Sequence, residues 1–144
     1  MRRVLTDSGP LFAIFSANDP AHETCVEALR EIPRPLVTTW PVLTEVVYLL
    51  RGRNAAVRRL LEAVVRAEWL TVAQLDDEAT PWFCEFFERF HDHEAQLADA
   101  AIVYLAEREG ADTVFTLDRR DSSIYRTSDG RTLDVIPESS PRVP

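Results

Sequence analysis

Apolar residues along this chain recur in two spacings, and the alternation between them predicts a series of strands and helices. Short runs rich in Val, Leu and Thr predict strands, whereas longer segments with apolar residues three and four positions apart predict helices. Because helical patterns separate the strand patterns, we expect a mainly parallel sheet of four to five strands with helices on both faces. The expected strands cover residues 3–6, 36–39, 70–73, 113–117 and 132–136.

Two of the predicted helices are almost entirely apolar, and each carries a single acid. In residues 42–50 the only charged residue is Glu45, and in residues 97–106 it is Asp99. Helices of this kind are buried on most sides. An ionised carboxylate in such surroundings requires a cation, a metal or several hydrogen-bond donors. Glu45 and Asp99 are therefore each expected to have a partner, and Gly110 is expected to end the second helix.

Two further acids, Asp7 and Asp118, each follow a predicted strand directly. Ligands of parallel sheets bind beyond the carboxyl ends of the strands, so both acids are expected at that edge. If the first and fourth strands are neighbours, Glu45 and Asp99 can turn to the same cleft. Each acid taken alone also has a structural interpretation: Asp7 and Asp99 as helix caps, Asp118 as a turn residue, and Glu45 as the partner of an arginine.

Four converging carboxylates need a counter-charge. Two of them about 4 Å apart repel by roughly 4 kcal/mol at an effective dielectric near 20. Oxygen ligands without a cluster of Cys and His favour Mg²⁺ or Mn²⁺ over Zn²⁺, and such a site can activate water and hydrolyse a phosphodiester. Ser8 and Thr116, which lie beside these acids in the sequence, are candidates for hydroxyl contacts to metal-bound water or to phosphate.

The composition of the 144-residue chain predicts one domain, covering residues 1–137, followed by a frayed tail at 138–144. We find no apolar run near the ~20 residues that span a bilayer and no secretory signal, so we expect a cytoplasmic protein without a membrane partner. Cys25 and Cys84 belong to no metal or redox motif and are predicted to be two buried thiols.

The net charge of −8 argues against a broad basic surface for nucleic acid. It does not exclude a nuclease, because a carboxylate site is acidic until its metal binds. All 16 basic residues are arginine, which excludes mechanisms that need a lysine nucleophile. Receiver domains and dehalogenase-like phosphatases also place acids at strand ends. The missing lysine and the glycine at position 9 disfavour both classes.

Several stretches of the chain resemble the motifs of the PIN-domain family, and within it the VapC-type toxins of bacterial toxin-antitoxin modules. VLTDSGPLFAIF resembles the first motif, WPVLTEVVYLLRG the second, and LADAAIVYLAEREGADTVFTLDRRD the third and fourth. The resemblance spans about residues 1–137. It implies an α/β/α sandwich, an endoribonuclease restrained by a cognate antitoxin, and a homodimer. It also implies a Mg²⁺ or Mn²⁺ site held by Asp7, Glu45, Asp99 and Asp118.

The chain departs from the family pattern after the fourth acid, where Ser122 stands in place of a frequent aromatic residue. Ile124 or Tyr125 is then a candidate to anchor this loop. Asp121 and Asp92 are extra acids near the site and are candidates for accessory roles, and for Asp121 the alternative is a salt bridge with a neighbouring arginine. Asp92 reaches the cleft only if one helix continues from it through to the third motif.

Arginines near the fourth acid are candidates to position RNA phosphates, with surface ion pairing as the alternative. They are Arg119, Arg120 and Arg126. The leading hypothesis is a metal-dependent endoribonuclease in which water is the nucleophile. The competing hypothesis is a PIN-like domain without catalysis, whose acidic pocket receives an arginine from a partner protein.

Overall fold

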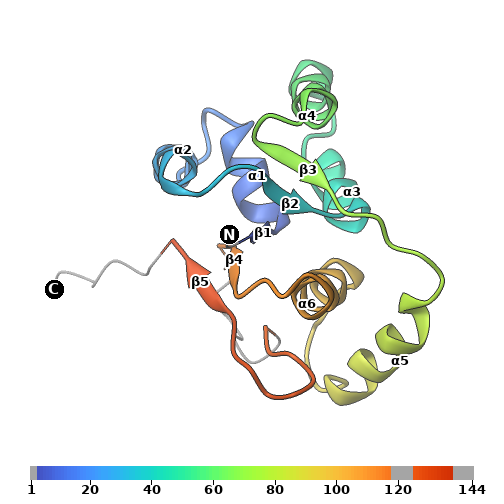
Figure 1. The fold of residues 1–144 in the computed structure, drawn as a ribbon. Helices are drawn as coiled ribbons and strands as arrows, with labels where there is room; N and C mark the ends of the chain where they lie inside the picture. Colours follow the sequence, from blue (N-terminus) through green and yellow to red (C-terminus); the bar gives the residue numbers. More distant parts are fainter. Residues whose placement is uncertain (1–2, 118–124, 138–144) are drawn as a thin grey trace, which may run out of the picture.

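The computed structural model describes residues 3–117 and 125–137, which form a central five-stranded sheet with helices on both sides (Figure 1). The strand order is β3-β2-β1-β4-β5, and every neighbouring pair is parallel. The predicted α/β/α sandwich is therefore confirmed. The strands are β1 (Val4–Thr6), β2 (Leu36–Thr38), β3 (Leu70–Val72), β4 (Thr113–Phe115) and β5 (Asp134–Ile136).

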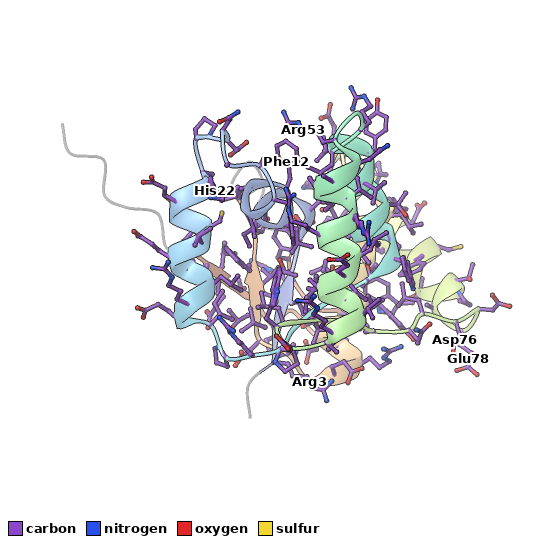
Figure 2. All side chains as sticks on the ribbon, turned by 90° about the horizontal axis from the view of Figure 1, so that it is seen from above. Arg3, Phe12, His22, Arg53, Asp76 and Glu78 are labelled. Atoms are coloured by element: carbon purple, nitrogen blue, oxygen red, sulfur yellow. The ribbon has the colours of Figure 1, made fainter. Side chains whose placement is uncertain are left out.

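The helices form two layers. On one side of the sheet α1, α2 and α4 lie next to one another, as the view from above shows (Figure 2), while α5 and α6 lie on the other side. The remaining helix, α3, contacts both α1 and α6. The bounds are α1 (Ser8–Ile14), α2 (His22–Glu31), α3 (Trp40–Leu49), α4 (Asn54–Arg66), α5 (Ala79–Arg89) and α6 (Leu97–Glu109).

The central strand β1 is buried over its whole length, because helices cover both faces of the sheet. Leu5 pairs in register with Val37 of β2 and with Val114 of β4. The carboxyl ends of β1 and β4 therefore meet at one edge. The topology thus places Asp7, the first residue after β1, beside the residues that follow β4.

The helix α6 matches the prediction closely, with seven buried residues and a left-handed Gly110 at its C-terminal cap (φ 67°). Its first residue, Leu97, is nevertheless 49% exposed. The expectation that α3 is buried on most sides is wrong, since Trp40, Tyr48 and Leu49 are exposed. The reason is geometric: α1 and α6 contact α3 and leave another face of this helix uncovered.

The prediction of two buried thiols holds for Cys25 and fails for Cys84, which is exposed; both cysteines are free. Cys84 lies on α5, which packs its aromatic stripe on α6 through contacts such as those of Trp82 and Phe83 with Tyr104. In the part of the chain that the structure describes, no helix is long and apolar enough to cross a membrane.

Candidate active site

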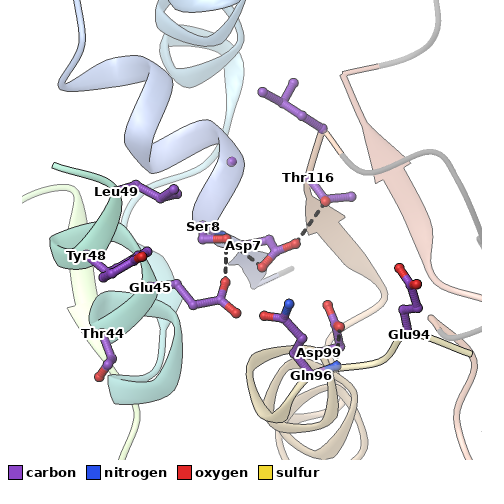
Figure 3. Close-up of a pocket in the computed structure, with 12 residues that line it drawn as sticks. Asp7, Ser8, Thr44, Glu45, Tyr48, Leu49, Glu94, Gln96, Asp99 and Thr116 are labelled. Atoms are coloured by element: carbon purple, nitrogen blue, oxygen red, sulfur yellow. Dashed lines mark hydrogen bonds between the residues drawn. The ribbon is translucent and has the colours of Figure 1, made fainter.

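A pocket of about 920 Å³ opens where the carboxyl ends of β1 and β4 face the helices α3 and α6 (Figure 3). Its described lining contains four acids and no arginine or histidine. Three of the four acids predicted from the sequence, Asp7, Glu45 and Asp99, lie on its wall. The remaining lining residues are Ser8, Gly9, Thr44, Tyr48, Leu49, Glu94, Gln96, Thr116 and Leu117.

Asp7 is the most buried of these acids, with 6% of its surface exposed. It caps the N-terminus of α1, because its Oδ1 accepts the Ser8 backbone N–H at 2.8 Å. Its Oδ2 accepts the hydroxyls of Thr116 at 3.1 Å and Tyr125 at 3.0 Å. The backbone N–H of Asp7 also donates to the Phe115 carbonyl at 2.9 Å. Contacts from α1, β4 and the segment before β5 thus hold this carboxylate in place.

Glu45 projects from α3 toward the same pocket, and its Oε2 accepts the Ser8 hydroxyl at 2.8 Å (Figure 3). Burial raises the pKa of Glu45 above its usual value of 4.5, and the negative charge of Asp7 raises this pKa further. The hydrogen bond from Ser8 acts in the opposite direction and stabilises the ionised form. The alternative that Glu45 pairs with an arginine is not seen among the described residues, where the hydrogen-bond partner of Glu45 is Ser8.

Asp99 is the third residue of α6 and has a local structural role. Its Oδ2 accepts the Gln96 backbone N–H at 2.8 Å, and the Gln96 side chain accepts the Asp99 backbone N–H, which together form a capping box. The alternative that Asp99 is the cap of a helix beginning at Ala100 is wrong, because α6 begins at Leu97. The Asp99 side chain thus caps α6 and also lines the pocket.

The negative charges of Asp7 and Asp99 act on the same neighbour. Burial raises the pKa of the Tyr125 hydroxyl above its ordinary value, and the charges of Asp7 and Asp99 raise it further. Gly9 shapes the same wall, because a Cβ at this position would meet the Cβ of Leu117 at 3.3 Å. Leu117, the second residue after β4, therefore comes close to α1 where the chain carries glycine.

The structure does not bring every candidate to the pocket. α5 ends at Arg89 and α6 begins at Leu97. The continuous helix that was needed to carry Asp92 into the cleft is therefore not present, and Asp92 is not among the residues that line the pocket. Its side chain is 83% exposed and lies 3.2 Å from His91 Nε2. Glu94 lines the pocket instead.

The other arginine and aspartate candidates have mixed outcomes. Arg126 is exposed, pairs through its backbone with Thr132, and is absent from the pocket lining. Asp118, Asp121, Arg119 and Arg120 lie outside the described residues. Sequence reasoning missed Gln96 and Glu94, because periodicity alone does not show where a helix is interrupted.

A divalent cation fits the chemistry of this pocket. Its charged lining residues are hard oxygen donors. Burial raises the pKa of Glu45, and the nearby charge of Asp7 raises it further, so a bound cation would relieve both effects. Within residues 3–117 and 125–137, no three side chains of His, Cys, Asp or Glu are close enough to form a ready-made metal site. Asp118, the fourth predicted ligand, is not in that range. The described part therefore supplies donors for a metal site but no complete ligand cluster.

Comparison with known proteins identifies the class. Residues 4–128 match the model of the PIN domain family, so the chain belongs to this family. It is 29% identical over 140 residues to ribonuclease VapC26 of Mycobacterium tuberculosis, and the match covers 93% of this chain and 100% of that protein. Its fold is similar to the crystal structure of Mycobacterium tuberculosis VapC20, a sarcin-ricin loop cleaving toxin. That match has a TM-score of 0.73 and 19% identity, and it covers 81% of this chain and 91% of VapC20.

Proposed function

We propose that this chain is a metal-dependent endoribonuclease, the toxin of a toxin-antitoxin module, which hydrolyses phosphodiester bonds in RNA. The observation that carries the proposal is the convergence of Asp7, Glu45 and Asp99 on one pocket at the carboxyl end of the sheet. Membership of the PIN domain family and the likeness to ribonuclease VapC26 support RNA as the substrate.

In this proposal Asp7, Glu45, Asp99 and Asp118 hold Mg²⁺ or Mn²⁺. The bound cation supplies an activated water and charge stabilisation on the phosphate. Hydrogen bonds from neighbouring hydroxyls orient the carboxylates: Ser8 donates to Glu45, and Thr116 donates to Asp7. Asp121 remains a candidate for an accessory role.

RNA contacts are proposed for two groups of residues. Arg119, Arg120 and Arg126 follow the fourth acid in the sequence and are proposed to bind phosphates. The second group is Arg51 and Tyr48: the guanidinium of Arg51 lies 4.3 Å from the centre of the ring of Tyr48, which lines the pocket. An aromatic ring with an arginine beside it is a surface on which an unpaired base can stack.

Exposed apolar side chains on α3 and α6 support a proposed homodimer. Tyr48 and Leu49 on α3 line the pocket and are exposed, and Trp40 on the same helix and Leu97 at the start of α6 are exposed as well. Exposed apolar groups gathered at one place are typical of a protein interface. We further propose a cognate antitoxin as a partner and the cytoplasm as the location, since an RNA substrate is found there. Residues 1–137 are proposed to act as one domain.

The test is RNA cleavage by the purified chain with Mg²⁺, with Mn²⁺ and with a chelator. We expect cleavage with either metal and none with the chelator. Asp99→Asn should lower the rate by about 100-fold or more, because it removes a charged ligand from the metal site. Asp92→Asn is the matched control, since it neutralises an exposed aspartate outside the pocket, and it should cleave within about twofold of the wild type.

The proposal is wrong if the wild type cleaves no RNA under either metal and Asp99→Asn behaves identically. Calorimetry distinguishes the proposed nuclease from the competing hypothesis of a binding subunit without catalysis. Tight binding of an arginine-bearing partner with no affinity for Mg²⁺ or Mn²⁺ would favour that alternative.

A further inference from the structure

Tyr125 is the largest fully buried side chain in the described part of the molecule, and its hydroxyl contacts a carboxylate of the proposed site. The hydroxyl oxygen lies 3.0 Å from Asp7 Oδ2 and 3.5 Å from Thr116 Oγ1. Tyr125 is 118 residues from Asp7 in the sequence. A buried tyrosine needs a hydrogen-bond partner for its hydroxyl, and here that partner is the first acid of the PIN-domain pattern.

The position of Tyr125 is set by the segment that leads into β5. Its carbonyl accepts the Leu133 backbone N–H at 3.0 Å, and the next residue, Arg126, forms a β-bridge with Thr132. A turn closed by the Thr127 and Arg131 backbones connects the two sides. Tyr125 as a whole is 1% exposed. The hydroxyl therefore approaches Asp7 from a fixed direction.

Counting the donors around Asp7 shows what the hydroxyl does. An ionised carboxylate has about four lone-pair directions and only accepts hydrogen bonds. Among the described residues, Thr116 and Tyr125 donate to Oδ2, and the Ser8 N–H donates to Oδ1. Both lone pairs of Oδ2 are then used. One lone pair is left on Oδ1.

We propose that Tyr125 is a positioning residue which, together with Thr116, occupies Oδ2 of Asp7 and leaves Oδ1 as the single oxygen that Asp7 presents to a divalent cation. This inference rests on the proposed function and deepens it. It assigns the orientation of the first acid to a residue outside the four acidic motifs. Without the Tyr125 hydroxyl, Oδ2 has a free lone pair, and the carboxylate can rotate away from its single-oxygen geometry.

The test is Mn²⁺ binding to the whole chain without RNA, measured by isothermal titration calorimetry. Tyr125→Phe removes only the hydroxyl and should weaken Mn²⁺ binding by about 10-fold, the usual effect of losing a group that orients a metal ligand. Thr116→Val removes the other donor to Oδ2 and should act in the same direction. Tyr104→Phe is the matched control, because this tyrosine lies against Trp82 and Phe83, away from Asp7. It should bind Mn²⁺ within about twofold of the wild type.

Thermal unfolding separates positioning from simple structural support. A structural role would lower the melting temperature in chelator without changing the affinity for Mn²⁺. If Tyr125→Phe is too unstable for calorimetry, the rise in melting temperature on adding Mn²⁺ reports the same affinity, and this rise should be smaller than in the wild type.

Three results would overturn the inference: Tyr125→Phe binds Mn²⁺ as tightly as the wild type, it binds more tightly, or Tyr104→Phe loses as much affinity. In each case a wild type that binds Mn²⁺ leaves the proposed function standing. If the wild type itself binds neither Mn²⁺ nor Mg²⁺, the inference and the metal-dependent function fail together.

Discussion

The hydrogen bond from the Ser8 hydroxyl to Glu45 Oε2, at 2.8 Å, connects the start of α1 to α3. Removing it tests how much this bond stabilises the ionised carboxylate of Glu45 in the pocket. Ser8→Ala removes this bond and leaves the Glu45 carboxylate without its described donor. Because the bond favours ionised Glu45, it stabilises the folded protein above the pKa of Glu45, and that contribution is lost as the pH falls through this pKa.

The expected size follows from the geometry. A hydrogen bond to a charged group contributes about 1.5–3 kcal/mol, and the half-buried position of Ser8 places this bond near the lower end. Unfolding entropy near 2.1 cal/mol/K per residue gives about 0.3 kcal/mol/K for a chain of 144 residues. The melting temperature of Ser8→Ala should therefore fall by about 5 °C at pH 7.5.

The assay is thermal unfolding in chelator at pH 7.5 and at pH 4. The folded pKa of Glu45 is raised above 4.5, so the carboxyl is protonated at pH 4, and the difference should shrink to about 2 °C. Thr44→Ala is the control, because its hydroxyl lines the same pocket but donates to the Trp40 carbonyl. A Ser8→Ala difference below about 1 °C at pH 7.5, or one that does not change with pH, would refute the reasoning.

Two further predictions concern groups whose pKa is shifted by the fold. Burial and the charge of Asp7 raise the pKa of Glu45. Ionised Glu45 therefore destabilises the metal-free protein, most strongly at a pH above that pKa. Glu45→Gln should therefore melt higher than the wild type at pH 7.5, with a gain that disappears by pH 4; a lower melting temperature at pH 7.5 would contradict this. Burial and the charge of Asp19 raise the pKa of Cys25 to about 11, whereas Cys84 is exposed. One thiol per chain should react quickly with a disulfide reagent at pH 8 and the second only after unfolding, and Cys84→Ser should abolish the fast phase.

Local patterns in the sequence were sufficient to predict the order of strands and helices. Strand composition, the helical spacing of apolar residues and Gly110 act over a few neighbours, so they are visible without the fold. The lone acids Glu45 and Asp99 also stood out locally, because a single charge in an apolar helix needs compensation. These signals were enough to predict a mainly parallel sheet covered by helices, and to select three of the acids that line the described pocket.

Tertiary structure decided what surrounds those acids. The parallel pairing of β1 with β4 places Asp7 beside Thr116, and the return of the chain before β5 brings Tyr125 to the same oxygen. The break between α5 and α6 puts Glu94 rather than Asp92 on the pocket wall. Sequence periodicity reports which face of an element is apolar, but contacts between residues more than 100 positions apart depend on how the elements pack. The sequence alone therefore identified three of the four acids in the described pocket lining, and only the packed sheet determined how their carboxylates are oriented.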